Sequence, residues 1–99
     1  MKFGLTKDQY EFILETVANP LRAKGSQVYC YGSRARGSHN PFSDLDLMVE
    51  SDLTEGQLGV PEIQESLQKS NFPYKVDIAH ISNFAESYRP SYEKDKVVF

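Results

Sequence analysis

The 99-residue sequence contains a single cysteine, Cys30, so no disulfide can form within the chain. It also lacks a surplus of positive charge, because 11 Lys and Arg stand against 14 Asp and Glu and the formal net charge is −3. This balance excludes a sequence-independent basic footprint for nucleic acid. No apolar run is long enough for a signal peptide or a membrane span. We therefore expect one soluble cytoplasmic domain, residues 1–99, with no direct nucleic-acid or membrane binding.

Several common catalytic and cofactor-binding motifs are missing as well. Gly32 and Gly37 have the spacing of a P-loop, but Ser38 stands where that motif requires lysine. Neither the Rossmann G-x-G-x-x-G pattern nor the G-x-S-x-G elbow of hydrolases occurs. His39 and His80 have no zinc-ligand spacing to each other or to the lone cysteine. These differences argue against each of the corresponding functions.

Hydrophobic spacing divides the chain into helical and extended segments. Thr6 and Gln9 form a capping box that opens a helix with an apolar stripe, and Asn19-Pro20 predicts a kink or break near its end. The further segments are predicted strands at 27–31, 44–50 and 74–80, and helical segments at 34–38, 61–70 and 82–90, the last interrupted or ended by Pro90. The order of elements is therefore α-β-α-β-α-β-α.

This order predicts a small α/β (α+β) domain with a mixed sheet of three to four strands and helices packed mainly on one face. In the second predicted strand, Asp44, Asp46 and Met48 lie on the face opposite to the apolar residues. The residues predicted to face the core are Leu45, Leu47, Val49, Val76 and Ile78. The apolar tail at 96–99 is expected to add an edge strand or to dock on a partner.

Paired carboxylates suitable for a metal follow shortly after a glycine-rich segment. Asp44 and Asp46 point to the same side of a strand, with Cα atoms about 6.5 Å apart. Asp77 lies in another predicted strand and can join them if the two strands are neighbours. Carboxylate oxygens suit Mg²⁺, which also takes phosphates as ligands. Two such ions, about 3.5–4 Å apart, would neutralise the three carboxylates and stabilise an in-line displacement.

Small and basic residues upstream complete a site for a nucleoside triphosphate. Gly32 allows close approach of the backbone to a phosphate, and Ser33 adds a hydroxyl donor. Arg34 or Arg36 can offset the phosphate charge. For Arg36, an ion pair with a carboxylate of the protein is an equally open alternative. Arg34 is expected to face solvent.

The motifs together resemble those of a known family. Gly32-Ser33-x-Ala35-Arg36-Gly37, then Ser43-Asp44-x-Asp46-Leu47, then Asp77 on a later strand, are similar to the minimal nucleotidyltransferases of the DNA polymerase β-like superfamily. The resemblance extends from about residue 27 to residue 81. It implies a nucleotidyltransferase-like fold, and of the two arginines the family pattern matches Arg36.

The resemblance also implies an activity. Ser33 would contact the triphosphate of ATP, Asp44 and Asp46 would hold two Mg²⁺ ions, and Asp77 would complete the metal site and help activate the acceptor hydroxyl. The reaction would transfer AMP and release pyrophosphate. Family members of this size act as antitoxins of HEPN-domain toxins, some by modifying a toxin tyrosine. A HEPN toxin, bound as a hetero-oligomer that supplies the acceptor site, is therefore the expected partner.

Other interpretations remain open at this point. Asp44, Asp46 and Asp77 could be ordinary solvent-facing strand residues. The protein could neutralise a toxin by stoichiometric binding alone, as the apolar tail Val97-Val98-Phe99 would permit. It could also modify a small hydroxyl compound of the aminoglycoside type, although relatives that do so usually carry an added domain.

Overall fold

A four-stranded mixed sheet forms the centre of the computed structural model, which describes residues 2–99. The strands are β1 (Gln27–Tyr31), β2 (Leu45–Glu50), β3 (Val76–His80) and β4 (Val97–Val98), in the spatial order β3-β2-β1-β4. β2 runs parallel to β3, whereas β1 is antiparallel to both β2 and β4. The C-terminal tail thus forms an edge strand, which is one of the two roles expected for it.

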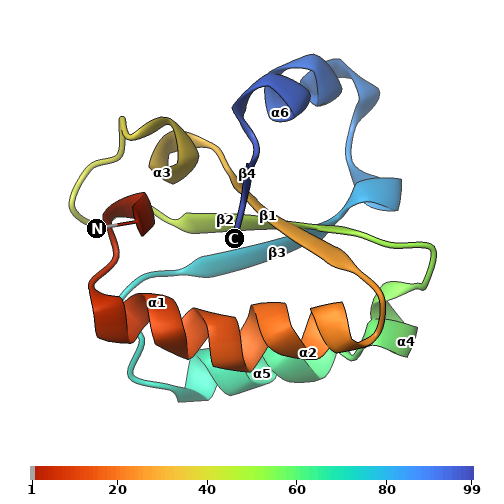
Figure 1. Ribbon diagram of the computed structural model, residues 1–99, viewed down its shortest axis with the longest axis horizontal. Helices are drawn as coiled ribbons and strands as arrows, with labels where there is room; N and C mark the ends of the chain where they lie inside the picture. Colours follow the sequence, from red (N-terminus) through yellow and green to blue (C-terminus); the bar gives the residue numbers. More distant parts are fainter. Residues whose placement is uncertain (1) are drawn as a thin grey trace.

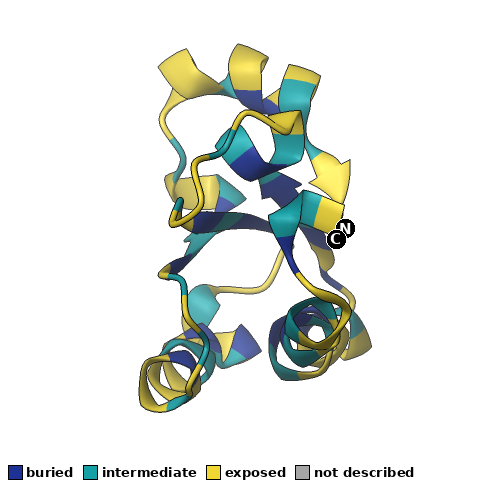
Figure 2. Ribbon diagram, turned by 90° about the vertical axis from the view of Figure 1, so that its left-hand side faces the viewer, coloured by how far each residue is buried: buried dark blue, intermediate teal, exposed yellow. Residues whose placement is uncertain are grey.

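The longer helices cover one face of this sheet (Figure 1). They are α1 (Lys7–Ile13), a π-helical segment (Leu14–Ala18) and α2 (Asn19–Ala23) from the N-terminal part, and α4 (Glu55–Leu58) and α5 (Val60–Lys69) from the β2–β3 connection. On the other side of the sheet lie α3 (Ser33–Arg36), α6 (Arg89–Asp95) and 3₁₀ turns at Glu86–Tyr88 and Lys2–Gly4 (Figure 2). The predicted fold class is confirmed. No helix among residues 2–99 is long and apolar enough to span a membrane.

The first helix begins as predicted but does not break at Pro20. Thr6 accepts a hydrogen bond from the Gln9 backbone and the Gln9 side chain accepts one from Thr6, which completes the capping box. The helix then widens into the π-helical segment, where the Asn19 N–H donates to Leu14 five residues back. Pro20 sits in the first turn after this segment, where its missing N–H disturbs the ladder least. The expected break was therefore wrong.

The second proline-based prediction also needs correction. Pro90 neither interrupts nor ends the last helix, because it stands in the first turn of α6. The preceding residues, predicted as helix, instead form the 3₁₀ turns Ile81–Asn83 and Glu86–Tyr88. Proline is favoured in a first helical turn because the N–H that it lacks would have no partner there. The missing N–H of Pro90, which was expected to interrupt or end a helix, is therefore compatible with the start of α6.

The core lies between the sheet and the longer helices. Leu45, Leu47 and Val49 are fully buried there, Val76 is nearly so, and Ile78 packs against them, as the alternation predicted. Met48, on the opposite face, is also fully buried, so that face is not a solvent face along its whole length. Other parts of the protein therefore cover the second face of the sheet at Met48.

Two kinds of contact hold α6 over this second face. Tyr92 of α6 packs edge-to-face on Tyr31 of β1, with ring centroids 5.5 Å apart. The Tyr92 hydroxyl also donates to Glu50 of β2, and the Lys96 ammonium lies 3.0 Å from the same carboxylate. Burial alone would raise the pKa of Glu50, but the hydrogen bonds from Tyr92 and Lys96 outweigh it and leave this pKa below its usual value. The C-terminal segment is thereby fixed beside the ends of β1 and β2.

Candidate functional site

The sheet brings two predicted site residues, Asp46 and Asp77, into one row with Tyr31. The strand register places Asp46 of β2 opposite Asp77 of parallel β3, and opposite Tyr31 of antiparallel β1. Side chains at paired positions point to the same face, and neighbouring strands are about 4.8 Å apart. Asp77 therefore lies beside Asp46, as the sequence predicted on the condition that their strands are neighbours.

Asp44 lies just outside this row. It precedes β2 and is exposed, while the next residue is tied to the start of β3 by a hydrogen bond from the Leu45 N–H to the Lys75 carbonyl, 2.8 Å long. Within residues 2–99, no three side chains of His, Cys, Asp or Glu are grouped closely enough to hold a metal ion. The joint metal site of Asp44, Asp46 and Asp77 therefore stays a prediction.

The carboxylates nevertheless act on one another electrostatically. Burial is the largest cause of the raised pKa of Asp46, and the charges of Asp77 and Asp44 raise it further. Lys75 opposes this effect and lies 3.7 Å from Asp77. Burial, followed by the charges of Asp46 and Asp77, also raises the pKa of Tyr31 to about 12. The site thus holds carboxylates that repel one another and that Lys75 offsets only in part, a repulsion that a bound cation would relieve.

Gly32 brings the backbone against Asp46. Its φ of +77° and ψ of −156° belong to a region that only glycine adopts readily. A Cβ on this residue would lie 2.8 Å from Asp46 Oδ2, closer than Cβ atoms approach non-bonded atoms, so the Asp46 side chain would have to move. Ser33 follows at once as the first residue of α3 and is partly buried. Both residues predicted to contact phosphate therefore adjoin the row of carboxylates.

The two arginines of α3 have different environments. Arg36 is half exposed, and its Nη1 lies 3.2 Å from Oδ2 of Asp95 in α6, so in this structure it pairs with a carboxylate. Arg34 was expected to face solvent, but it is only 2% exposed. Its guanidinium donates to the carbonyls of Ser43 and Phe3, at 3.0 and 2.9 Å. These two backbone acceptors satisfy Nε and Nη1 and so reduce the cost of burying the group, whereas Nη2 has no hydrogen-bond partner.

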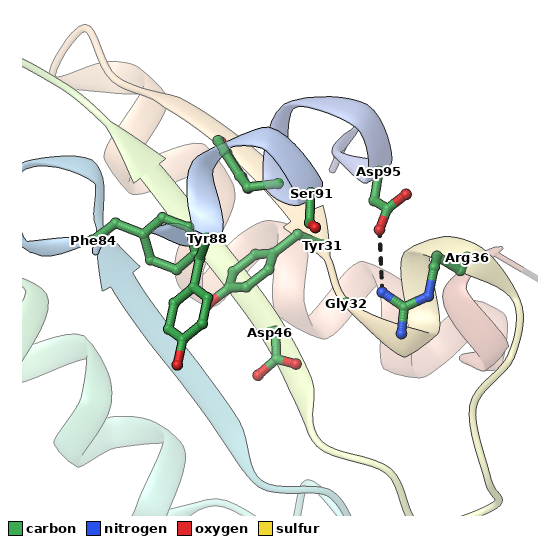
Figure 3. Close-up of a pocket in the computed structure, with 9 residues that line it drawn as sticks. Tyr31, Gly32, Arg36, Asp46, Phe84, Tyr88, Ser91 and Asp95 are labelled. Carbon is green, nitrogen blue, oxygen red and sulfur yellow. Dashed lines mark hydrogen bonds and ion pairs between the residues drawn. The ribbon is translucent and has the colours of Figure 1, made fainter. Parts of the chain in front are cut away.

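A cavity of about 340 Å³ opens beside Asp46, and we call it the carboxylate pocket (Figure 3). One wall comes from β1, β2 and α3, and the other from the C-terminal segment. Its lining residues are Tyr31, Gly32, Arg36, Asp46, Phe84, Tyr88, Ser91, Tyr92 and Asp95. The second wall was not predicted. The spacing of four residues between the aromatic side chains of that segment was the signal that could have identified it.

Comparison with known proteins agrees with this geometry. A family model described as a nucleotidyltransferase domain matches residues 13–99. The chain belongs to the nucleotidyltransferase domain family. The match includes every residue predicted for the site, and it extends well beyond the glycine-serine and aspartate motifs in both directions.

Two individual proteins are similar to this nucleotidyltransferase domain. The probable protein adenylyltransferase MntA of Haemophilus influenzae is 31% identical over 71 residues, which are 72% of this chain and 62% of that protein. The matched region thus spans less than two thirds of the relative's length. A solved structure described as a toxin-antitoxin with AMP-PNP has the same fold, with a TM-score of 0.65 at 20% identity, covering 85% of this chain and 69% of the other.

Proposed function

We propose that this nucleotidyltransferase domain is a Mg²⁺-dependent enzyme that transfers AMP from ATP to a tyrosine hydroxyl of a HEPN-domain toxin, and thereby acts as the antitoxin of the pair. The observation that carries the proposal is the placement of Asp46 beside Asp77 on parallel neighbouring strands, directly against the Gly32 backbone. Carboxylates for cations and a backbone segment for phosphates are thus adjacent, as transfer from a metal-bound triphosphate requires.

The residues present suit Mg²⁺. Aspartate oxygens are its preferred protein ligands, and the raised pKa of Asp46 reflects burial and a mutual repulsion that a cation would remove. Asp44, Asp46 and Asp77 are the residues that would hold the ions. When bound, Mg²⁺ would neutralise charge on the phosphates and on the departing pyrophosphate.

The remaining roles fall to groups of the protein. The Ser33 hydroxyl and the backbone after Gly32 would bind the outer phosphates, and Arg36 would offset their charge after leaving Asp95. Asp77 would accept the proton of the acceptor tyrosine. The tyrosine oxygen would then form a bond to the α-phosphorus, while the bond from this phosphorus to the bridging oxygen breaks and pyrophosphate leaves.

The assignment of a toxin partner is supported by the similar proteins. The similar protein from Haemophilus influenzae is named a protein adenylyltransferase, and the structure with the same fold is a toxin-antitoxin with AMP-PNP. The HEPN class of toxin and the tyrosine acceptor come from the family resemblance of the motifs. The carboxylate pocket is open at the surface, so an acceptor side chain of a partner could enter it.

The test uses ATP labelled at the α-phosphate, with Mg²⁺ and a purified HEPN-domain toxin as the acceptor. We expect label on the toxin with the unmodified protein and none with Asp46→Asn. Asp52→Asn is the matched control, because it removes the same charge from an exposed residue outside the site. Absence of label with all proteins folded would overturn the proposal. Toxin neutralisation by an Asp46→Asn protein would instead favour the stoichiometric antitoxin.

A further inference from the structure

A second cavity of about 340 Å³ lies between the 3₁₀ turn Lys2–Gly4, α3 and β4. None of the described lining residues is acidic, and four of them carry a positive charge or gain one on protonation, namely Lys2, Arg34, Arg36 and His39. We call it the cationic pocket. A concentration of one charge is notable in a chain whose formal net charge is −3, because the basic residues elsewhere are outnumbered by carboxylates.

Arg34 is the central feature of this pocket. It is 2% exposed, yet in the described part of the chain no carboxylate oxygen lies within 4.0 Å of its guanidinium. Nε and Nη1 donate to the carbonyls of Ser43 and Phe3, and the group lies 4.2 Å from the ring centroid of Tyr74. Nη2 is buried without a partner. Buried charges are normally paired, so this guanidinium has both an unused donor and an unbalanced charge.

His39 provides a second unused group at the same place. Its Nδ1 is buried without a hydrogen-bond partner, and it can donate in one neutral tautomer or when the ring is protonated. The Nε2 edge of the ring and Arg34 Nη1 both lie next to Gly4. A Cβ added to this glycine would collide with His39 Nε2 and lie 2.9 Å from Arg34 Nη1. The two side chains therefore approach each other closely over a glycine, although both carry or can carry positive charge.

We infer that the cationic pocket binds a phosphate group, at a site separate from the carboxylate pocket. A phosphate dianion balances more than one positive charge and offers several acceptor oxygens, which suits a cavity lined by Lys2, Arg34 and His39 and by no acidic residue among those described. A carboxylate has one charge and fewer acceptors. Inorganic phosphate and the phosphate of a nucleotide share the recognised chemistry.

Arg36 connects the two sites, because it lines both cavities and pairs with Asp95 at the edge of the carboxylate pocket. A phosphate held in the cationic pocket would compete with Asp95 for this guanidinium. The inference itself depends on the charged lining residues Lys2, Arg34 and His39, and not on Arg36 or on the carboxylate pocket. It stands whether or not the proposed transferase activity is found.

The experiment is a titration of the ¹⁵N-labelled protein with inorganic phosphate, without Mg²⁺ or nucleotide and at constant ionic strength. The Arg34 Nε–H and His39 ring resonances report on the site. We expect saturable shifts with the unmodified protein. In Lys2→Ala and His39→Ala the Kd for phosphate should rise about tenfold or more, since each substitution removes a charge-assisted or hydrogen-bonding group. Lys69→Ala is the matched control for the loss of a lysine, because Lys69 is exposed on α5.

A parallel titration with AMP separates the two sources of phosphate. Tighter binding of AMP that depends on the same variants would assign the site to a nucleotide, and equal affinities would assign it to free phosphate. Shifts that rise linearly with phosphate, or saturable binding unchanged in both Lys2→Ala and His39→Ala, would overturn the inference. Both substitutions lie outside the hydrophobic core, and the dispersion of each amide spectrum verifies that the variant is folded.

Discussion

Arg36 of α3 and Asp95 of α6 form an ion pair, 3.2 Å between Nη1 and Oδ2, that joins the two walls of the carboxylate pocket. The residue proposed to offset phosphate charge is thus already bound to a carboxylate of the protein. If Arg36 has the proposed role, ATP would have to displace Asp95 before it could use this guanidinium. The pair would then oppose nucleotide binding to the extent that it is stable.

Removal of the competing carboxylate is expected to favour ATP. Partly exposed ion pairs contribute about 0.2–1 kcal/mol, so Asp95→Asn should lower the KM for ATP by up to about fivefold with little change in kcat. The measurement is steady-state transfer at several ATP concentrations and two ionic strengths. Glu93→Gln, on the same helix but outside the pocket lining, is the control. An unchanged or higher KM in Asp95→Asn would contradict the proposed role of Arg36.

The raised pKa of Asp46 predicts a specific dependence of stability on pH. The folded state holds the Asp46 proton more tightly than the unfolded chain does, so stability falls as pH rises from about 4, the ordinary aspartate value, through the raised pKa. Asp46→Asn should remove this loss. The variant should be more stable than the parent at neutral pH by about 1 kcal/mol or less, and the difference should vanish at acidic pH. Thermal unfolding of both proteins across pH, without divalent cations, tests this.

Gly32 and Gly37 are expected to differ in their tolerance of a side chain, because they differ both in ψ, −156° against 14°, and in the space around them. Both have φ near +77°, but a Cβ at Gly37 would meet nothing within 4 Å, whereas one at Gly32 would lie 2.8 Å from Asp46 Oδ2. Gly37→Ala should cost about 1 kcal/mol of stability and retain activity. Gly32→Ala should cost about 2 kcal/mol or more, because its φ and ψ are nearly exclusive to glycine, and should abolish transfer. Urea unfolding with activity assays distinguishes them, and equal effects would contradict the special role of the backbone at Gly32.

The two arginines of α3 should differ sharply in their effect on folding. Arg34→Met leaves the carbonyls of Ser43 and Phe3 without donors and should reduce the free energy of unfolding by about 2 kcal/mol or more. Arg36→Met removes only a half-exposed ion pair and should cost less than about 1 kcal/mol. Urea titrations of both variants are the measurement. A similar loss in each would show that Arg34 has no greater structural role than Arg36.

Local patterns in the sequence were sufficient to predict several features of the structure. The capping box at Thr6, the alternation that buries Leu45 and Leu47, and the glycine-serine and aspartate motifs each depend on residues close together in the chain. Periodicity and spacing report directly on such local features, because side-chain direction follows from the backbone geometry of one segment. The family and fold class were therefore within reach of the sequence alone.

Only the tertiary structure decided how distant segments meet. That Asp77 lies beside Asp46 depends on parallel pairing of β3 with β2, which no local pattern specifies. The burial of Arg34 required the carbonyl of Phe3, which lies 31 residues away in the chain, and the second wall of the carboxylate pocket required α6 to fold back over β1 and β2. Contacts of this kind are determined by which surfaces pack together, and the sequence around each residue does not identify its distant partner. The sequence by itself thus determined the chemical groups of the site, and the packing of the sheet decided which of them are neighbours.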